Sequence, residues 1–418
     1  DTLEVALIGC GGRGTGAAED ALATQAKHGT IRLTAMADYL PGKVERSYKL
    51  LKDKNPSLVD VPKERQFSGL NAFKQAMDSL KPGNIAIFAT PPAFRWVFFK
   101  YAIEKGLNVF LEKPVTVDGP TSKRMLELSK EADAKNLKVG VGLMVRHCRG
   151  RQELEKRIRD GEIGDIISMR AYRMHGPVGY AFSAPKPEKM SHLQYQITRF
   201  HSFLWGSGGL FSDFYIHQID ECCWMKGAWP VKAHAVGGRH FRGDAIDQNF
   251  DNYHIEYTFA DGTKFFYDGR TMNGCHNEFH SAAHGTKGVA IISAAGHSPG
   301  KVAPSQGPQY IAAKKIWAFP QPEQNPYRLE WEDLVDAIKN NKPYNEVPRG
   351  VAASVATSMG RMAAHTGRPV TYDEMLNCPH EFAPGLDTLT DDSPAPLQPG
   401  PDGKYPIPEP GIKKDREY

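Results

Sequence analysis

A glycine-rich turn between an apolar strand and a helix constrains this chain more than any other feature. The run Val5–Ile8 leads directly into Gly9-Cys10-Gly11-Gly12-Arg13-Gly14, and a second apolar run, Ile31–Ala37, ends at Asp38. In a G-x-G-x-x-G turn the first glycine permits the tight turn, the second lets the backbone approach a pyrophosphate, and the third lets helix and strand pack closely. The phosphates then lie on the free amides of the helix N-terminus. The pattern predicts a dinucleotide site formed by Gly9, Gly11, Gly12, Arg13, Gly14 and Asp38.

Asp38 predicts which dinucleotide is bound. A carboxylate at the end of the second strand accepts hydrogen bonds from ribose hydroxyls and repels a 2′-phosphate. Tyr39 and Leu40, which follow it, bring no positive charge to offset that repulsion, although Arg13 and Lys43 are near in the sequence. We therefore expect NAD as the cofactor, in preference to NADP.

Composition narrows the class of protein. The 418 residues, of which 40% are hydrophobic and 24% charged, suit a globular chain of two domains. A net charge of +4 implies no nucleic-acid or membrane partner, and no run approaches the ~18 continuous apolar residues of a membrane span. The six cysteines are scattered, which predicts neither a disulfide framework nor a zinc site.

Alternation of strands and helices divides the chain into domains 1–145 and 146–380 and an arm, 381–418. In the first domain apolar runs alternate with helical patterns, which gives a parallel sheet covered by helices on both faces. In the second, strands at hairpin spacing predict a largely antiparallel sheet. The arm is rich in proline and glycine. The fold class is α/β, with strands expected at Val5–Ile8, Ile31–Ala37, Ile85–Phe88, Leu107–Leu111, Val139–Val141, Ile166–Arg173, Val231–Phe241, Tyr253–Phe259, Thr263–Tyr267 and Gly288–Ile292. Helices are expected at Arg13–Lys27, Lys43–Asp53, Ala72–Leu80, Phe94–Lys105, Ser122–Ala134, Arg328–Lys339 and Val351–Ala364, the last packing back on the first domain.

A lysine follows one of these strands directly. Glu112-Lys113-Pro114 comes after the run Leu107–Leu111, at the strand end where such sheets bind their ligands. A lysine there can hydrogen-bond a substrate hydroxyl and the ribose, and can favour a developing alkoxide. The alternative is a surface lysine in a turn.

Asp213 and His217 form a second set. If the segment is helical, the two side chains are one turn apart on one face. A histidine that titrates near neutrality suits removal of an alcohol proton, and a carboxylate beside it would orient the ring and raise its basicity. The alternative is a buried structural histidine, with Asp213 acting as a helix cap.

The sequence does not assign a single role to two further groups of side chains. Tyr195, Phe200, His201, Phe203 and Trp205 precede the Asp213 segment, where rings can stack on a sugar or belong to the core. Three histidines have four-residue spacing, but their order is not that of a metalloprotease, and we expect no metal. They are His276, His280 and His284.

Taken together, these motifs resemble the glucose–fructose oxidoreductase / inositol dehydrogenase family (Gfo/Idh/MocA), from Val5 to about Leu376. The resemblance rests on the glycine turn, the Thr90-Pro91 turn, the E-K-P tripeptide, the D-x-x-x-H segment, Arg146, Gly285-Thr286-Lys287-Gly288 and the segment 359–367. It implies a Rossmann domain followed by an α/β domain with an open, mainly antiparallel sheet, which places the three spaced histidines on that sheet. Where family members often carry a histidine after the T-P turn, this chain has Phe94-Arg95-Trp96.

The resemblance also implies roles. Lys113, Asp213 and His217 would be the catalytic set, with His217 the acid/base. Thr90, Pro91, Glu112 and Lys113 would join the cofactor site, and Arg146, Tyr195, Trp205 and His217 the substrate site. The expected function is an NAD-dependent oxidoreductase that transfers hydride to or from a ring hydroxyl of a sugar, glycoside or cyclitol. The alternative is a redox-neutral glycoside hydrolase that uses tightly bound NAD through transient oxidation at carbon 3 and elimination; Lys113 favours the dehydrogenase.

Location and assembly are the remaining expectations. Because the chain starts at Asp1 rather than methionine and the family has exported members, periplasm is favoured, with cytoplasm as the alternative. The open sheet predicts a homo-oligomer, a dimer or tetramer. The arm should cross onto a neighbouring subunit, anchored by Leu397, Tyr405 and Ile407, because it has little apolar surface of its own. The alternative is an arm that lies on its own subunit.

Overall fold

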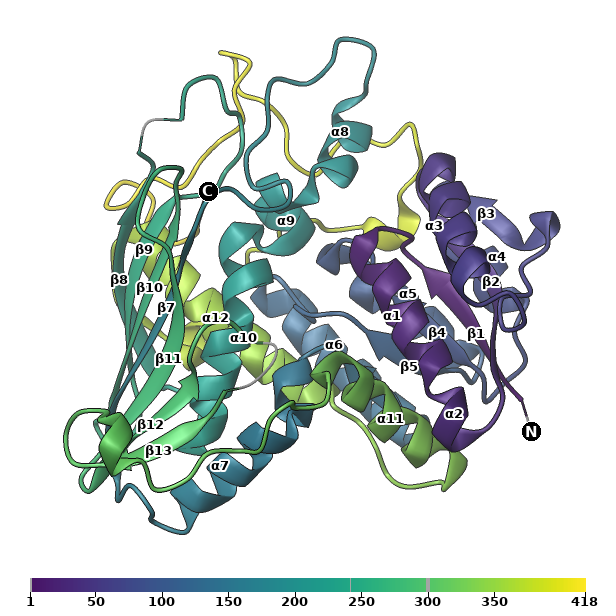
Figure 1. Ribbon diagram of the computed structural model, residues 1–418. Helices are drawn as coiled ribbons and strands as arrows, with labels where there is room; N and C mark the ends of the chain where they lie inside the picture. Colours follow the sequence, from purple (N-terminus) through teal and green to yellow (C-terminus); the bar gives the residue numbers. More distant parts are fainter. Residues whose placement is uncertain (1, 241, 298–300) are drawn as a thin grey trace.

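The computed structural model describes residues 2–240, 242–297 and 301–418 and contains two β-sheets with helices packed between them (Figure 1). Asp1 and Phe241, the expected end of one strand, lie outside the described residues.

Six parallel strands form the first sheet, in the order β3-β2-β1-β4-β5-β6. Every residue of β4 and β5 is buried, as expected of parallel strands covered on both faces, and the predicted Rossmann-like domain is confirmed. The strands are β1 Leu3–Ile8, β2 Ile31–Asp38, β3 Gln66–Ser68, β4 Ile85–Phe88, β5 Asn108–Leu111 and β6 Val139–Val141. The helices are α1 Gly12–Ala23, α2 Gln25–His28, α3 Pro41–Lys54, α4 Ala72–Asp78, α5 Arg95–Glu104 and α6 Gly119–Ala134.

The prediction of a single helix over Arg13–Lys27 is wrong in one respect, because the segment forms two helices, α1 and α2. At the division the Thr24 hydroxyl donates to the backbone oxygen of Ala21 at 2.7 Å. A threonine side chain that bonds the preceding turn competes with the helical hydrogen bond, which accounts for the interruption.

Eight strands form the second sheet, in the order β13-β12-β11-β7-β10-β9-β8-β14, and only the β7–β10 pair is parallel. The expected mainly antiparallel sheet is confirmed. Helices α10 and α12 pack on one face, and on the opposite face Val236 is 67% exposed. The strands are β7 Ile166–His175, β8 Lys232–Gly238, β9 Asn252–Thr258, β10 Lys264–Thr271, β11 Glu278–Gly285, β12 Gly288–Ser293, β13 Ala303–Gln306 and β14 Val370–Thr371. The remaining helices are α7 Arg149–Arg159, α8 His192–Thr198, α9 Leu204–Ser207, α10 Gly209–Lys226, α11 Pro326–Lys339, α12 Val347–Thr366 and α13 Tyr372–Asn377.

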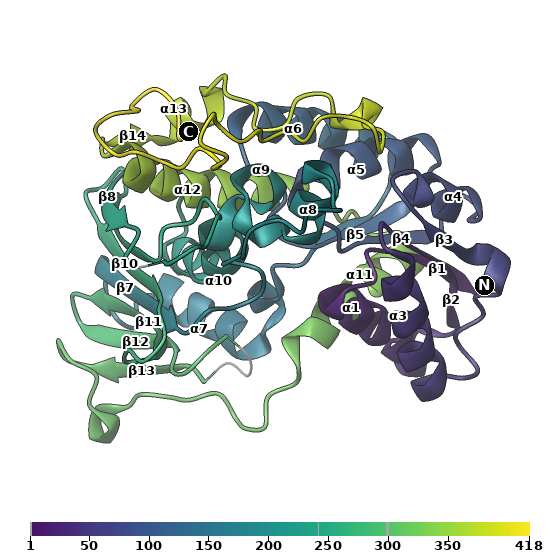
Figure 2. The same cartoon turned by 90° about the horizontal axis from the view of Figure 1, so that it is seen from above.

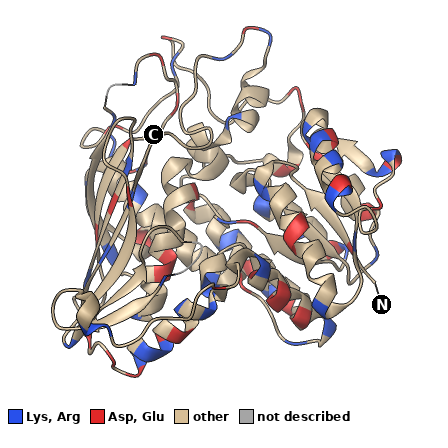
Figure 3. Cartoon of the chain, viewed as in Figure 1, with Lys and Arg blue, Asp and Glu red and all other residues tan. Residues whose placement is uncertain are grey.

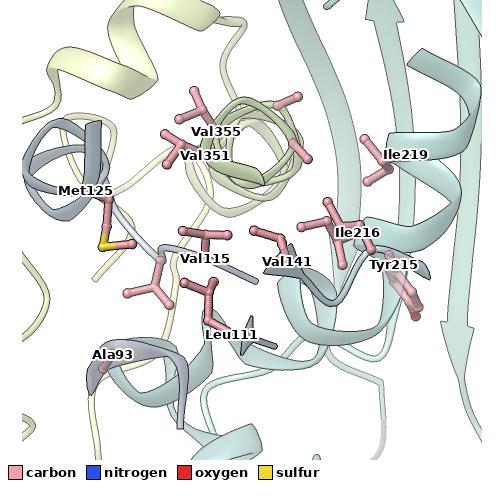
Figure 4. Close-up of a cluster of buried hydrophobic side chains, with 14 of the residues drawn as sticks. Ala93, Leu111, Val115, Met125, Val141, Tyr215, Ile216, Ile219, Val351 and Val355 are labelled. Atoms are coloured by element: carbon pink, nitrogen blue, oxygen red, sulfur yellow. The ribbon is translucent and has the colours of Figure 1, made fainter. Parts of the chain in front are cut away.

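Helix α12 joins the two domains, as its sequence predicted. Val351 and Val355 lie in a cluster of buried side chains with Val115 and Val141 of the first domain (Figure 4). On the other side of α12 the same core continues to Ile216 of α10. One continuous core therefore holds the two domains in a fixed relation to each other.

The arm lies on its own chain, which corrects the expectation that it crosses to a neighbour. It begins beside α6, where Glu381 pairs with Arg124, and ends against α12 (Figure 2). Leu397 and Tyr405 are buried anchors, as expected, but the backbone oxygen of Leu397 accepts a hydrogen bond from Gln196 of the same chain at 2.8 Å. Near the end of the arm, Glu417 pairs with Arg361 of α12. These contacts within one chain offset the entropy that ordering the arm costs.

Charged residues of both signs lie along α7 and α11, in keeping with the small net charge (Figure 3). Among the helices of the described residues, none combines the length and the apolar character that crossing a membrane demands.

Candidate active site

The glycine turn forms one end of a cleft of about 780 Å³ between the two domains. Gly9 has a φ of +99°, and a Cβ on Gly14 would stand 1.8 Å from the Gly9 oxygen, so both positions require glycine. A Cβ on Gly11 or Gly12 would meet nothing within 4 Å, which leaves their backbone open to a ligand. Helix α1 begins at Gly12 with no side-chain cap, so its N-terminus is open to an anion such as a pyrophosphate.

Asp38 stands beside this turn at the end of β2. Its Oδ2 accepts a hydrogen bond from the Cys10 amide at 2.8 Å, and its Oδ1 accepts one from the Leu40 amide at 2.9 Å. These two bonds hold the carboxylate at the rim of the cleft. Arg13 lies in the same wall, where its Nε is 3.1 Å from Glu112 and its Nη2 3.2 Å from Asp20.

The expected cofactor residues all line this one cleft; they are Gly9, Gly11, Gly12, Arg13, Gly14, Asp38, Thr90, Pro91, Glu112 and Lys113. Arg95, which follows the Thr90-Pro91 turn, ties two of their loops together. Its Nε donates to the backbone oxygen of Glu112 at 2.9 Å, and its Nη1 donates to the backbone oxygen of Thr90 at 2.6 Å. Burial lowers the pKa of Arg95 to about 10.

Beyond Asp38 the cleft adjoins a smaller pocket that the arm helps to close. Leu386, Asp387 and Leu389 of the arm line this pocket together with Asp38 and Pro91. The hydroxyl of Tyr39 donates to Asp391 of the arm at 3.2 Å. The arm therefore forms part of the wall beside the expected ribose-binding residue, which the sequence did not indicate.

The opposite end of the cleft holds a lysine–aspartate–histidine group. Lys113 donates to the backbone oxygen of Asp213 and lies 3.2 Å from its Oδ1, and the side chain of Lys113 is only 13% exposed. Oδ2 of Asp213 contacts Nε2 of His201. Burial alone would raise the pKa of Asp213, but Lys113 and His201 lower it, so Asp213 is a carboxylate. Asp213 lies inside α10 rather than at its N-cap, which is Gly208.

The hydrogen bonds of His201 assign its tautomer. The Tyr180 amide donates to Nδ1 of His201 at 3.1 Å, so Nδ1 is an acceptor and the proton is on Nε2, which donates to Asp213. Both ring nitrogens of His201 are therefore engaged. The expectation that Asp213 orients His217 is wrong, because its two carboxylate oxygens are directed to Lys113 and His201.

His217 lies in the same cleft with a different environment. It is 4% exposed, its Nδ1 has no hydrogen-bond partner among the described residues, and its ring stacks on His297 with centroids 4.6 Å apart. Burial, followed by the charges of His297 and Lys113, lowers the pKa of His217 well below 6.5. His217 is therefore neutral near pH 7 and can accept a proton.

Three of the expected substrate residues lie away from the cleft. Arg146 makes a two-pronged ion pair with Asp220, with Nη2 and Oδ1 2.7 Å apart. Tyr195 donates its hydroxyl to the backbone oxygen of Ala184, and Trp205 is fully buried in the core. These three side chains stabilise the fold instead, because each is satisfied by a partner or by packing.

The aromatic residues and histidines noted in the sequence lie in different parts of the fold. Phe200 and His201 line the cleft, whereas Phe203 is core. His280 and His284 are on the strand β11, as the resemblance implied, and His276 precedes it. Sequence reasoning did not indicate several other cleft residues as functional, among them Arg173, Tyr180, His297 and Tyr327. Of these, Arg173 had a signal, since it puts a charge at an inward position of a strand.

Comparison with known proteins gives concordant matches. The family model described as GFO/IDH/MocA C-terminal domain matches residues 151–291. Inositol 2-dehydrogenase of Corynebacterium glutamicum is 24% identical over 165 residues, 39% of this chain, and the match spans only 42% of that relative. scyllo-Inositol 2-dehydrogenase (NAD(+)) of Bacillus subtilis strain 168 is 24% identical over 303 residues, 70% of this chain and 79% of that protein. Levoglucosan dehydrogenase in complex with NADH and levoglucosan shares the fold, with a TM-score of 0.65 at 17% identity over 89% of this chain and 99% of that chain.

Proposed function

The chain belongs to the Gfo/Idh/MocA family, and on this basis we propose that it is an NAD-dependent oxidoreductase that acts on a ring hydroxyl of a sugar, glycoside or cyclitol. The observation that carries the proposal is the single cleft that joins the glycine turn and Asp38 to Lys113, Asp213 and His217. The names of the relatives, an NAD(+)-dependent inositol dehydrogenase and a sugar dehydrogenase with NADH, point the same way.

The first domain fits the cofactor. The open backbone at Gly11 and Gly12 would receive the pyrophosphate, and Asp38 would accept hydrogen bonds from the ribose hydroxyls. The pocket closed by the arm would hold the adenine. NAD, when bound, supplies the nicotinamide that takes up or gives back hydride.

The second end of the cleft supplies the proton chemistry. His217 is neutral, and we assign it the removal of the hydroxyl proton during oxidation. An ammonium has three donors, and Lys113 directs two contacts to Asp213, so a third donor can polarise the substrate oxygen. Asp213 holds Lys113 in place, and His201 in turn orients Asp213.

The experiment loads the protein with NAD and follows reduced-nicotinamide absorbance with sugars, glycosides and cyclitols. Reduction by at least one of these supports the proposal. Cofactor binding without reduction by any of them contradicts it. Release of an aglycone with no net change in the cofactor would instead indicate the redox-neutral hydrolysis.

We also propose that the chain forms a dimer or tetramer through the uncovered face of the second sheet. Strand register places Val236, His254, Asp268 and Tyr172 in one row on that face, opposite the side covered by α10 and α12. Sedimentation that gives the mass of one chain at micromolar concentration would refute this proposal. The variant Val236→Lys should weaken the assembly, because it places a charge in the interface.

A further inference from the structure

We propose that Arg173 binds a carboxylate group of the substrate, so that the substrate is an acidic sugar such as a uronic or aldonic acid. This inference rests on the proposed oxidoreductase function and names the substrate class of the same cleft.

Arg173 occupies an inward position of β7. Met169 and Ala171, on the same face of the strand, are fully buried apolar residues, and Arg173 continues their series with 9% of its surface exposed. Its guanidinium lies between the rings of Phe214 and Phe279, 5.4 and 4.8 Å from their centroids. The side chain lines the cleft beside the reacting groups. A strand position that normally takes an apolar residue thus brings a charge to the cleft.

The pairing of Arg173 differs from that of the other buried arginines. Arg151 pairs with Glu221 and Arg361 with Glu417, and Arg95 donates to two backbone oxygens. Arg173 donates from Nη1 to the backbone oxygen of Phe214, but its Nε has no partner among the described residues. A buried guanidinium with unused donors is costly, and an anionic ligand would satisfy them.

The charges around Arg173 favour a ligand of one negative charge. Two carboxylates line the cleft near the reacting groups: Lys113 and His201 occupy the oxygens of Asp213, and Glu112 lies 3.1 Å from Nε of Arg13. The guanidinium of Arg173 is therefore not neutralised by the chain. A planar fork of donors matches a carboxylate, and a single cation balances a monoanion better than a doubly charged phosphate.

The experiment compares matched acids and neutral sugars. With NAD-loaded protein, kcat/KM is measured for glucuronate against glucose and for galacturonate against galactose, with glucose 6-phosphate as a further anion. We expect each acid to exceed its neutral partner by about 10- to 100-fold, the value of a charge-assisted contact. Arg173→Met should raise KM for the acids, so that the ratio of kcat/KM between each acid and its neutral partner falls to about one.

Two further variants make the result specific. Arg173→Lys keeps the charge but not the fork, and should recover part of the preference. Arg170→Gln, an exposed arginine on the same strand, should leave the preference unchanged. Neutral sugars that match their acids, or a phosphate that exceeds both, would overturn this inference alone. If no sugar reduces NAD, the proposed function fails, and tryptophan fluorescence then decides the inference: glucuronate binding that Arg173→Met abolishes supports it, and absent binding overturns it.

Discussion

The arm is held at its end by a buried ion pair whose removal should destabilise the whole chain. Glu417 accepts hydrogen bonds from Nε and Nη2 of Arg361, each at 2.8 Å, and lies 2.9 Å from Nδ1 of His365. Arg361 is fully buried and Glu417 is 2% exposed. Glu417→Ala leaves the buried guanidinium without its carboxylate partner, although it still donates to Ser212 and to the backbone oxygen of Val117, so we expect the free energy of unfolding to fall by about 3–5 kcal/mol.

The pKa of Glu417 gives an independent value for this loss of unfolding free energy. Burial alone would raise that pKa, but Arg361 and His365 lower it from 4.5 to about 2. Such a difference corresponds to about 3 kcal/mol of stability. Because the folded-state pKa is the lower one, this stability is complete above about pH 4.5 and is lost as the pH falls toward 2. The difference between wild type and Glu417→Ala should therefore shrink over that range.

Urea unfolding followed by tryptophan fluorescence measures both effects. Glu409→Ala is the matched control, because Glu409 forms a surface pair with Lys413 at 3.3 Å and should cost less than about 1 kcal/mol. A Glu417→Ala protein within about 1 kcal/mol of wild type at pH 7 would refute the reasoning. A difference that stays constant from pH 5 to about pH 2 would refute the assignment to the ionised carboxylate.

Three other predictions concern the cleft. Lys113→Ala and His217→Ala should each lower kcat by about 10²–10⁴-fold with little change in the Kd for NAD; wild-type turnover in either variant removes that residue from the mechanism. Asp38→Ala should weaken NAD binding and narrow its preference over NADP, measured by titrating both cofactors, and tighter NADP binding by the wild type would contradict the assignment. The double variant Leu386→Ala, Leu389→Ala should release NAD faster in stopped-flow displacement, whereas an unchanged rate would show that the arm does not close the adenine pocket.

The glycine turn shows what a local pattern can predict. The left-handed backbone at Gly9 and the close approach at Gly14 are properties of a few consecutive residues, so the motif reports them directly. The position of Lys113 followed in the same way, because it comes after a buried strand of a parallel sheet, and such strand ends meet at one edge. Periodicity likewise placed the longer strands of the first sheet and the helices that cover it, which are set by which faces are buried. It did not indicate β3, β11, β13 or β14, nor the helices α7, α8, α9 and α13.

The partners of the buried charges were decided only by tertiary structure. Helical spacing places Asp213 and His217 on neighbouring turns, yet Lys113, 100 positions away, and His201 occupy the Asp213 carboxylate. The arm was expected to need a neighbour, because composition alone does not reveal that Arg361 would meet Glu417. Ion pairs and hydrogen bonds depend on distances between segments that folding brings together, whereas strands, helices and turns depend mainly on residues near one another in the chain.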